Sequence, residues 1–189
     1  MAGFAEVAGR LREAGIEVRG GMATVFGCPF EGEVPLESLL RIVSAYVALG
    51  VDHVGLGDTT GMATPTNIRR VVRALKAEFP QVQYTLHLHN TRGIGLANVL
   101  VGLEEGVRRF DSSVAGLGGC PFAAGATGNI CTEDLVYLLH ESGYRTGIDL
   151  YKAIEVARKM EQTLGRQLSG QVMRAGPRLA LHEAEAVQT

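Results

Sequence analysis

Two histidines, His87 and His89, stand one residue apart in the segment 86–90, which reads Leu-His-Leu-His-Asn. Alternate side chains of a β-strand share a face, so both imidazoles would point one way and Leu86 and Leu88 the other. Imidazole nitrogen is a good ligand for divalent cations, and two rings on one strand face can bind the same ion. The pattern predicts half of a divalent-metal site. The alternative is a structural pair, with one ring bonded to a backbone carbonyl and the other exposed at the strand end.

A second group of candidate residues lies in a glycine-rich segment, 114–129. Glycine lets the backbone take positive φ and approach a ligand closely, which suits a lid over a site. Cys120 lies at the tip of this segment, where a thiol could transfer a proton. Asn129 follows it and could offer an amide oxygen to a metal. The alternative is a flexible loop with an inert thiol.

The elements that must position these residues alternate regularly along the chain. Strands alternate with amphipathic helices, and most helices are closed by glycine or proline. The pattern predicts parallel strands joined by right-handed crossovers. We expect strands at 16–26, 54–56, 84–89 and 109–114, and helices at 3–14, 35–49, 66–79, 95–105, 132–141 and 149–163.

Two α/β architectures fit this alternation: an open doubly wound sheet, and part of a TIM (β/α)8 barrel. Polar and glycine-rich loops follow the strands, whereas the connections from helix to strand are short. That asymmetry is typical of a barrel whose chemistry lies at the carboxyl ends of its strands. A complete barrel needs about 250 residues, and this sequence has 189. We expect residues 1–165 to form half a barrel and residues 166–189 to form a C-terminal tail.

Composition excludes several classes of function. The net charge is −2 with acids and bases interspersed, so neither nucleic-acid binding nor a polybasic membrane anchor is indicated. The three cysteines are an odd number without paired spacing, which favours a reducing compartment. No apolar run approaches the roughly 20 residues needed to span a bilayer. We expect a cytoplasmic protein.

Taken together, four motifs resemble the 3-hydroxy-3-methylglutaryl-CoA lyase family of barrel-forming metallolyases. The similarity extends from about residue 15 to residue 168. The paired histidines are shared with related synthases, whereas the Gly-Gly-Cys-Pro loop is typical of the lyases and disfavours a Claisen-type synthase. The motifs are GCPFEG at 27–32, GDTTG at 57–61, HLH at 87–89 and GGCP at 118–121.

The resemblance implies a role for each of five residues. His87, His89 and Asn129 would bind a divalent metal, Mg²⁺ or Mn²⁺. Cys120 would take part in proton transfer from the lid, and Asp58 would lie close to the substrate at a strand end. The reaction would cleave a 3-hydroxy-3-methylglutaryl-CoA-like thioester to acetyl-CoA and acetoacetate, as in leucine degradation.

The segment after the second histidine departs from the family pattern. Family members typically have Asp-Thr-Tyr-Gly-Gln after the second histidine. Here Asn90 replaces the aspartate and Arg92 replaces the tyrosine. The amide removes a carboxylate that could hold a histidine tautomer. The guanidinium suits a carboxylate or a CoA phosphate. We expect Arg92, Thr59 and Gly119 to bind the acyl-CoA substrate, which could then be citramalyl-CoA; the alternative is that Arg92 is a solvated loop charge.

A larger departure is that the family's first strand, which carries an aspartate ligand beside an arginine, has no counterpart here. The sequence matches strands 5 to 8 and begins in the helix before them. We expect a truncated or split enzyme, completed by an N-terminal half or paired as a homo-oligomer, and no substantial activity from the isolated chain. The alternative is a non-catalytic half-barrel that binds metal or a partner half.

Charged residues outside these motifs have simpler interpretations. Glu133 opens a predicted helix and could face the site, but a role in complementing the helix dipole is favoured. Arg108 and Arg109 begin a predicted strand at the end opposite the site, which indicates surface charge.

Overall fold

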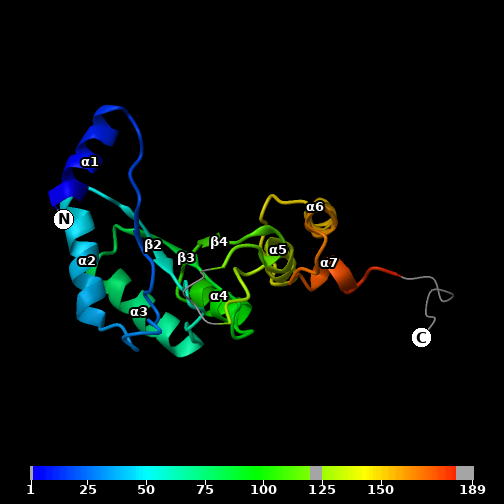
Figure 1. Cartoon of the computed structure of the whole chain (residues 1–189). Coiled ribbons are helices and arrows are strands. Elements are labelled where there is room, and N and C mark those ends of the chain that lie inside the picture. The colour runs from blue at the N-terminus through cyan, green and yellow to red at the C-terminus, as the bar shows by residue number, and fades with distance from the viewer. Residues whose placement is uncertain (1, 120–124, 182–189) are drawn as a thin grey trace. The chain divides into compact units, whose positions relative to one another are not determined.

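The computed structural model describes residues 2–119 and 125–181. Two compact units make up the chain: residues 1–111 with 118–129, and residues 112–117 with 130–189. Figure 1 shows the elements of both units. The first unit contains α1 (Ala2–Glu13), β1 (Gly20–Met22), α2 (Leu36–Ala48), β2 (His53–Gly57), α3 (Pro65–Glu78), β3 (Gln83–His87), α4 (Gly95–Glu104) and β4 (Arg109–Asp111). The second contains the 3₁₀ helix η1 (Val114–Gly116), α5 (Thr132–Glu141), α6 (Leu150–Leu164) and α7 (Val172–Ala175).

The first unit is built on a parallel sheet of four strands in the order β1-β2-β3-β4. Leu56 pairs with Leu86, and Gly57 pairs with His87. Leu56 and Leu86 are fully buried, whereas the neighbouring positions on the other face carry glycine or polar side chains. The prediction of an α/β fold with parallel strands and intervening helices is confirmed.

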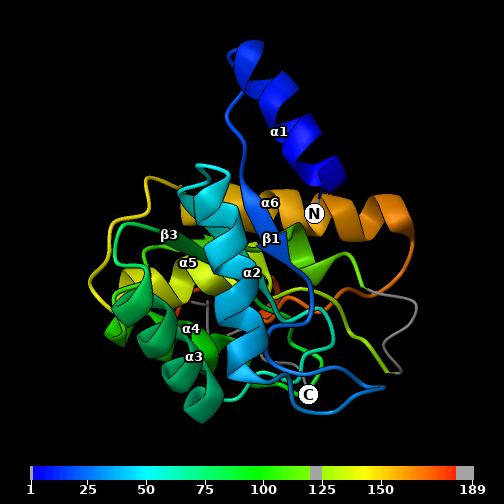
Figure 2. The ribbon, with the colours of Figure 1, turned by 90° about the vertical axis from the view of Figure 1, so that its left-hand side faces the viewer.

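Helices α2, α3 and α4 cover the apolar face of this sheet. Thr64 and Asn67 form a capping box at the start of α3, and Pro65 occupies its first turn, which stabilises the helix start. In Figure 2, α2 runs past β1; a Cβ at Gly20 would lie 2.9 Å from the ring of Tyr46. The lack of a side chain at Gly20 therefore allows α2 and β1 to pack closely.

Three strands are shorter than predicted, and β3 ends at His87 rather than at residue 89. The apolar run 16–26 forms a strand only at Gly20–Met22, because the chain then turns into a loop in which Val25 and Phe26 are buried. In the run 109–114, the strand ends at Asp111, and η1 begins at Val114. Ala115 there has φ 53°, a left-handed conformation that a strand cannot contain.

The second unit has its own apolar core. Residues from η1, α6 and the segment after α6 pack together, and Leu168 and Met173 from the expected tail are buried with them. The tail therefore contributes core residues and a helical turn, α7. In the described part of the chain, no helix combines the length and apolarity needed to cross a membrane.

Candidate functional site

The paired histidines lie at the carboxyl end of β3 with their rings facing each other. Their Nε2 atoms are 3.3 Å apart, and the ring planes meet edge to face with centroids 5.2 Å apart. Nδ1 of His87 faces the carboxylate of Asp111 at 3.8 Å. The sequence prediction that both rings share one face is confirmed.

This pair fits a divalent cation. When two nitrogens bind one metal at roughly 2.1 Å and the nitrogen–metal–nitrogen angle lies between the octahedral and tetrahedral values, the nitrogens are about 3 to 3.4 Å apart. The observed 3.3 Å falls within that span. His89 is 5% exposed, and its burial, with the charge of His87, lowers its pKa. A lowered pKa keeps the imidazole neutral, the form in which it binds metal.

Asn129 lies beside His89, although 40 positions separate the two in the sequence. The two residues form an isolated antiparallel bridge, and the Asn90 amide donates to the carbonyl of Gly128 at 3.0 Å. The amide and side-chain nitrogens of Asn129 both donate to the carbonyl of Gly118, at 3.1 and 3.2 Å. The structure thus brings the three expected ligands together.

The third member of this set is an amide. Within the described residues, no group of three or more histidine, cysteine, aspartate or glutamate side chains is arranged to hold a metal. A site of two imidazoles and an amide oxygen leaves positions for further oxygen ligands, which Mg²⁺ and Mn²⁺ prefer.

Asp58 directly follows β2 and is 2% exposed. Its amide donates to the carbonyl of His87 at 2.8 Å, and its Oδ1 accepts the amide of Ala63 at 2.8 Å. Burial raises the pKa of this carboxyl to about 6, against the opposing influence of nearby amides and of Arg92. A carboxyl with such a pKa can exchange a proton near neutral pH.

The glycines of β1 and β2 leave a hollow next to His87. The cavity has a volume of about 320 Å³, and the side chain of Thr59 at its edge donates to the carbonyl of Ala23 at 2.6 Å. Sequence reasoning missed this hollow, although glycines at alternate positions in β2 signal a face without side chains. The lining residues are Gly21, Met22, Ala23, Gly55, Gly57, Thr59 and His87.

Three further residues were expected at the site: Gly119, Arg92 and Cys120. Gly119 belongs to the same unit as the histidines. Arg92 is exposed, and its Nη1 donates to the carbonyls of Thr60 and Gly61 at 3.0 and 2.8 Å. Arg92 is therefore bonded to the loop after β2 although its side chain is exposed. Cys120 lies outside the described residues.

Comparison with known proteins identifies the relationship that this arrangement suggests. The sequence profile of the HMGL-like family matches residues 2–160. The chain belongs to the HMGL-like family.

Several relatives in the HMGL-like family are similar to this chain over most of its length. A hydroxymethylglutaryl-CoA lyase of Bacillus subtilis is 42% identical, over 83% of this chain and 52% of the relative. The (R)-citramalyl-CoA lyase of Chloroflexus aurantiacus is also 42% identical, over 92% of this chain and 55% of the relative. The chain thus spans about half the length of the curated relatives it matches.

A solved HMGL-like structure shows the same fold. It is an HMG-CoA lyase from Acinetobacter baumannii in complex with coenzyme A and 3-methylmalate. It superposes with a TM-score of 0.89 at 46% identity, covering 96% of this chain and 59% of the other.

Two acidic residues of this HMGL-like chain make contacts that the sequence did not predict. Glu133 and Asp134 lie in the first turn of α5, where carboxylates complement the helix dipole. Glu133 accepts the amide of Ala115 at 3.0 Å, and Asp134 accepts the amide of Val172 at 2.7 Å. The expected acidic first turn is observed, and both carboxylates are in addition buried and bonded to segments distant in sequence.

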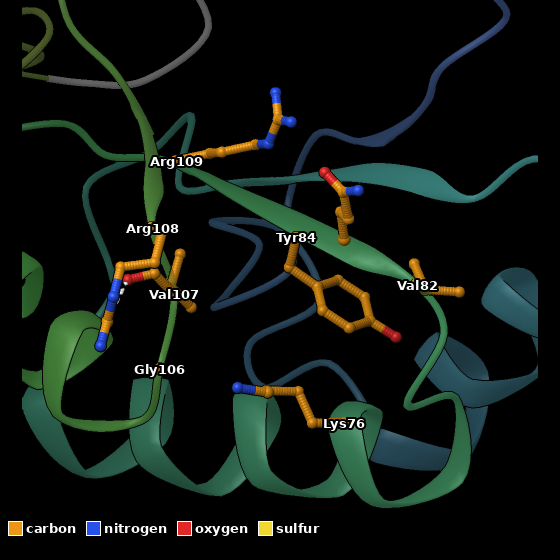
Figure 3. Close-up of a pocket in the computed structure, with 8 residues that line it drawn as sticks. Lys76, Val82, Tyr84, Gly106, Val107, Arg108 and Arg109 are labelled. Atoms are coloured by element: carbon orange, nitrogen blue, oxygen red, sulfur yellow. Dashed lines mark hydrogen bonds between the residues drawn. The ribbon is translucent and has the colours of Figure 1, made fainter.

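A second cavity lies at the opposite ends of β3 and β4 (Figure 3). Its volume is about 400 Å³. Lys76 donates to the carbonyl of Glu105 at 2.9 Å, and Arg108 donates to the carbonyl of Leu103 at 2.9 Å. These cations thus stabilise the end of α4, and Arg108 and Arg109 are exposed there as expected.

Proposed function

We propose that this chain provides the metal-binding half of a carbon–carbon lyase that acts on a 3-hydroxy-3-methylglutaryl-CoA-like thioester. The products would be acetyl-CoA and acetoacetate. The observation that carries the proposal is the gathering of His87, His89 and Asn129 at the carboxyl ends of parallel strands, beside a buried Asp58. Membership of the HMGL-like family supports the same reaction class.

In this proposal His87, His89 and Asn129 hold Mg²⁺ or Mn²⁺. The bound cation would lower the pKa of the substrate's tertiary hydroxyl. Nε2 of His87 is already directed toward His89 because its Nδ1 faces Asp111. Asp111 would thereby help to fix the orientation of the His87 ring.

Asp58 is the proposed base. Its Oδ1 accepts the Ala63 amide, so the hydroxyl proton would pass to Oδ2. The bond between the carbinol carbon and the thioester α-carbon then breaks, leaving a ketone and a thioester enolate. Cys120 would donate a proton to the enolate carbon, giving acetyl-CoA. Thr59, Gly119 and the remaining donors of Arg92 would bind the acyl-CoA.

The proposal includes the barrel architecture. The four parallel strands would be strands 5 to 8 of a TIM barrel, and a separate N-terminal half would supply the missing anionic ligand. A second copy of this chain is the alternative partner. A chain that bound metal or a partner half without supporting turnover would instead be a non-catalytic half-barrel.

The test is complementation. The purified chain, with Mg²⁺ and 3-hydroxy-3-methylglutaryl-CoA, is assayed for acetyl-CoA release with and without the N-terminal half of a relative. We expect turnover only with both halves, and loss of that turnover in His89→Ala. Turnover by the isolated chain would contradict the split-enzyme proposal, and no turnover in a stable complex of both halves would contradict the lyase proposal.

A citramalyl-CoA-type lyase is the second candidate. It is supported by the 42% identity to the Chloroflexus aurantiacus enzyme and by the guanidinium of Arg92, which could pair with a second carboxylate. Parallel assays with both thioesters decide between them, because the preferred substrate has the higher kcat/KM.

A further inference from the structure

We propose that Arg92 is a positioning residue that clamps the loop after β2 against the loop after β3. The clamp would hold Asp58 in register with the strand end that carries His87 and His89. Its value for catalysis rests on the proposed lyase function, but the clamp itself is a property of the ligand-free chain and is tested separately.

The contact is made by one atom of the guanidinium. Nη1 of Arg92 donates to the carbonyls of both Thr60 and Gly61, at 3.0 and 2.8 Å. Both acceptors are backbone atoms of the loop that begins at Asp58. The hydrogen bonds therefore restrain the path of that loop rather than a single side chain.

The two loops are also packed tightly beneath this contact. A Cβ placed on Gly61 would lie 2.6 Å from the Cβ of Thr91. Gly61 has φ 60°, a left-handed conformation that glycine adopts without strain. The loop can therefore come close enough to Thr91 for the guanidinium of the next residue to reach its carbonyls.

Arg92 is the outermost of several attachments between this loop and the β3–α4 unit. The Asp58 amide donates to the carbonyl of His87 at 2.8 Å. At the far end of the loop, the buried side chain of Asn98 donates to the carbonyl of Ala63 at 3.0 Å. Between these two points, Arg92 holds Thr60 and Gly61. Without it, Thr60 and Gly61 would lose their hydrogen bonds to the loop after β3.

The chemistry of the guanidinium suits this role better than an ammonium would. Its planar group has five N–H donors in a fixed arrangement, so Nη1 can bridge two carbonyls while Nε and Nη2 stay available. A substrate-binding role through those remaining donors is compatible with the clamp. The two roles differ in when they act, because only the clamp operates before substrate binds.

Amide hydrogen exchange of the ligand-free chain is the decisive measurement. In Arg92→Gln we expect exchange at Gly61, Ala63 and Gly93 to become at least fivefold faster, with α2 unchanged. Arg92→Lys should fall between wild type and Arg92→Gln, because an ammonium can hold a carbonyl without the planar geometry. The matched control is Arg70→Gln, an exposed arginine of α3, which should leave all these rates unchanged.

Co²⁺ absorption tests whether the clamp also positions the histidines. We expect Arg92→Gln to alter the visible spectrum of Co²⁺ bound at His87 and His89 and to weaken its binding at least threefold, whereas Arg70→Gln does neither. Wild-type exchange rates and a wild-type spectrum in Arg92→Gln would overturn the proposal, even if acyl-CoA binding fell. Loss of the clamp would be visible whether or not the chain proves to be a lyase.

Discussion

At the scale of single residues, the two histidines have unequal surroundings. The side chain of His87 is 37% exposed and faces Asp111, whereas His89 is buried and its pKa is lowered. A buried neutral imidazole keeps its ligand nitrogen free of a proton, and its ring is restrained by packing. His89 is therefore the residue on which metal affinity should depend most.

We predict that His89→Ala weakens Mn²⁺ or Co²⁺ binding at least tenfold, about 1.4 kcal/mol. Isothermal titration calorimetry measures the affinity. His140→Ala is the control, because His140 is exposed on α5 and its ring bonds to the side chain of Thr146. Equal affinities in the two variants would rule out the paired histidines as the metal site.

A second prediction concerns Glu133, which is fully buried and whose pKa is raised by burial. A raised folded-state pKa means that the contribution of Glu133 to stability is fully present below its unfolded value and is lost as pH rises through the folded value. The Glu133→Gln variant has no carboxyl to ionise, so it does not lose this stability as the pH rises. Relative to wild type, the variant should therefore gain unfolding free energy when the pH is raised from 5 to 8.

Urea denaturation at both pH values measures this change. Glu155→Gln, an exposed position on α6, serves as the control and should show no pH-dependent difference from wild type. A parallel pH dependence in Glu133→Gln and wild type would show that Glu133 is ionised in the folded chain at both pH values.

At the scale of elements, helices were predicted more accurately than strands. The predicted helix 132–141 is α5 itself, and 149–163 differs from α6 by one residue at each end. Helical periodicity and end signals are local, so sequence alone contains them. The strand predicted at 16–26 is limited to β1, because only residues 20–22 pair in parallel register with β2. Apolar residues beyond it are buried in a loop instead.

The closeness of β1 and β2 gives the third prediction. A Cβ on Gly57 would lie 2.7 Å from the carbonyl oxygen of Met22, so Gly57→Ala must push the strands apart. We expect a loss of about 1–3 kcal/mol in unfolding free energy, measured by urea denaturation. Gly21→Ala is the control, since nothing lies within 4 Å of its added Cβ. A loss of similar size in both variants would contradict this account.

At the scale of the whole molecule, the sheet has two edge strands, β1 and β4, in the part of the chain that the structure describes. Parallel sheets are stable when both faces are covered, and open edges favour pairing with another chain. The chain matches about half the length of its relatives, and in the proposed barrel the further strands would pair with β1 and β4.

We therefore predict that the purified chain self-associates at micromolar concentration. Adding the N-terminal half of a relative should convert the associated forms into a one-to-one complex. Sedimentation velocity measures both species. A chain that remains monomeric and does not bind the added half would contradict the prediction.

By itself, the sequence determined the alternation of strands and helices, the shared face of His87 and His89, and the family. These features depend on spacing along a short stretch of chain. Only the tertiary structure decided that Asn129 lies beside His89, that Arg92 bonds to the loop after Asp58, and that Glu133 bonds to Ala115. Each of these contacts joins residues 18 or more positions apart, so it exists only where the intervening segments return the chain to the same place.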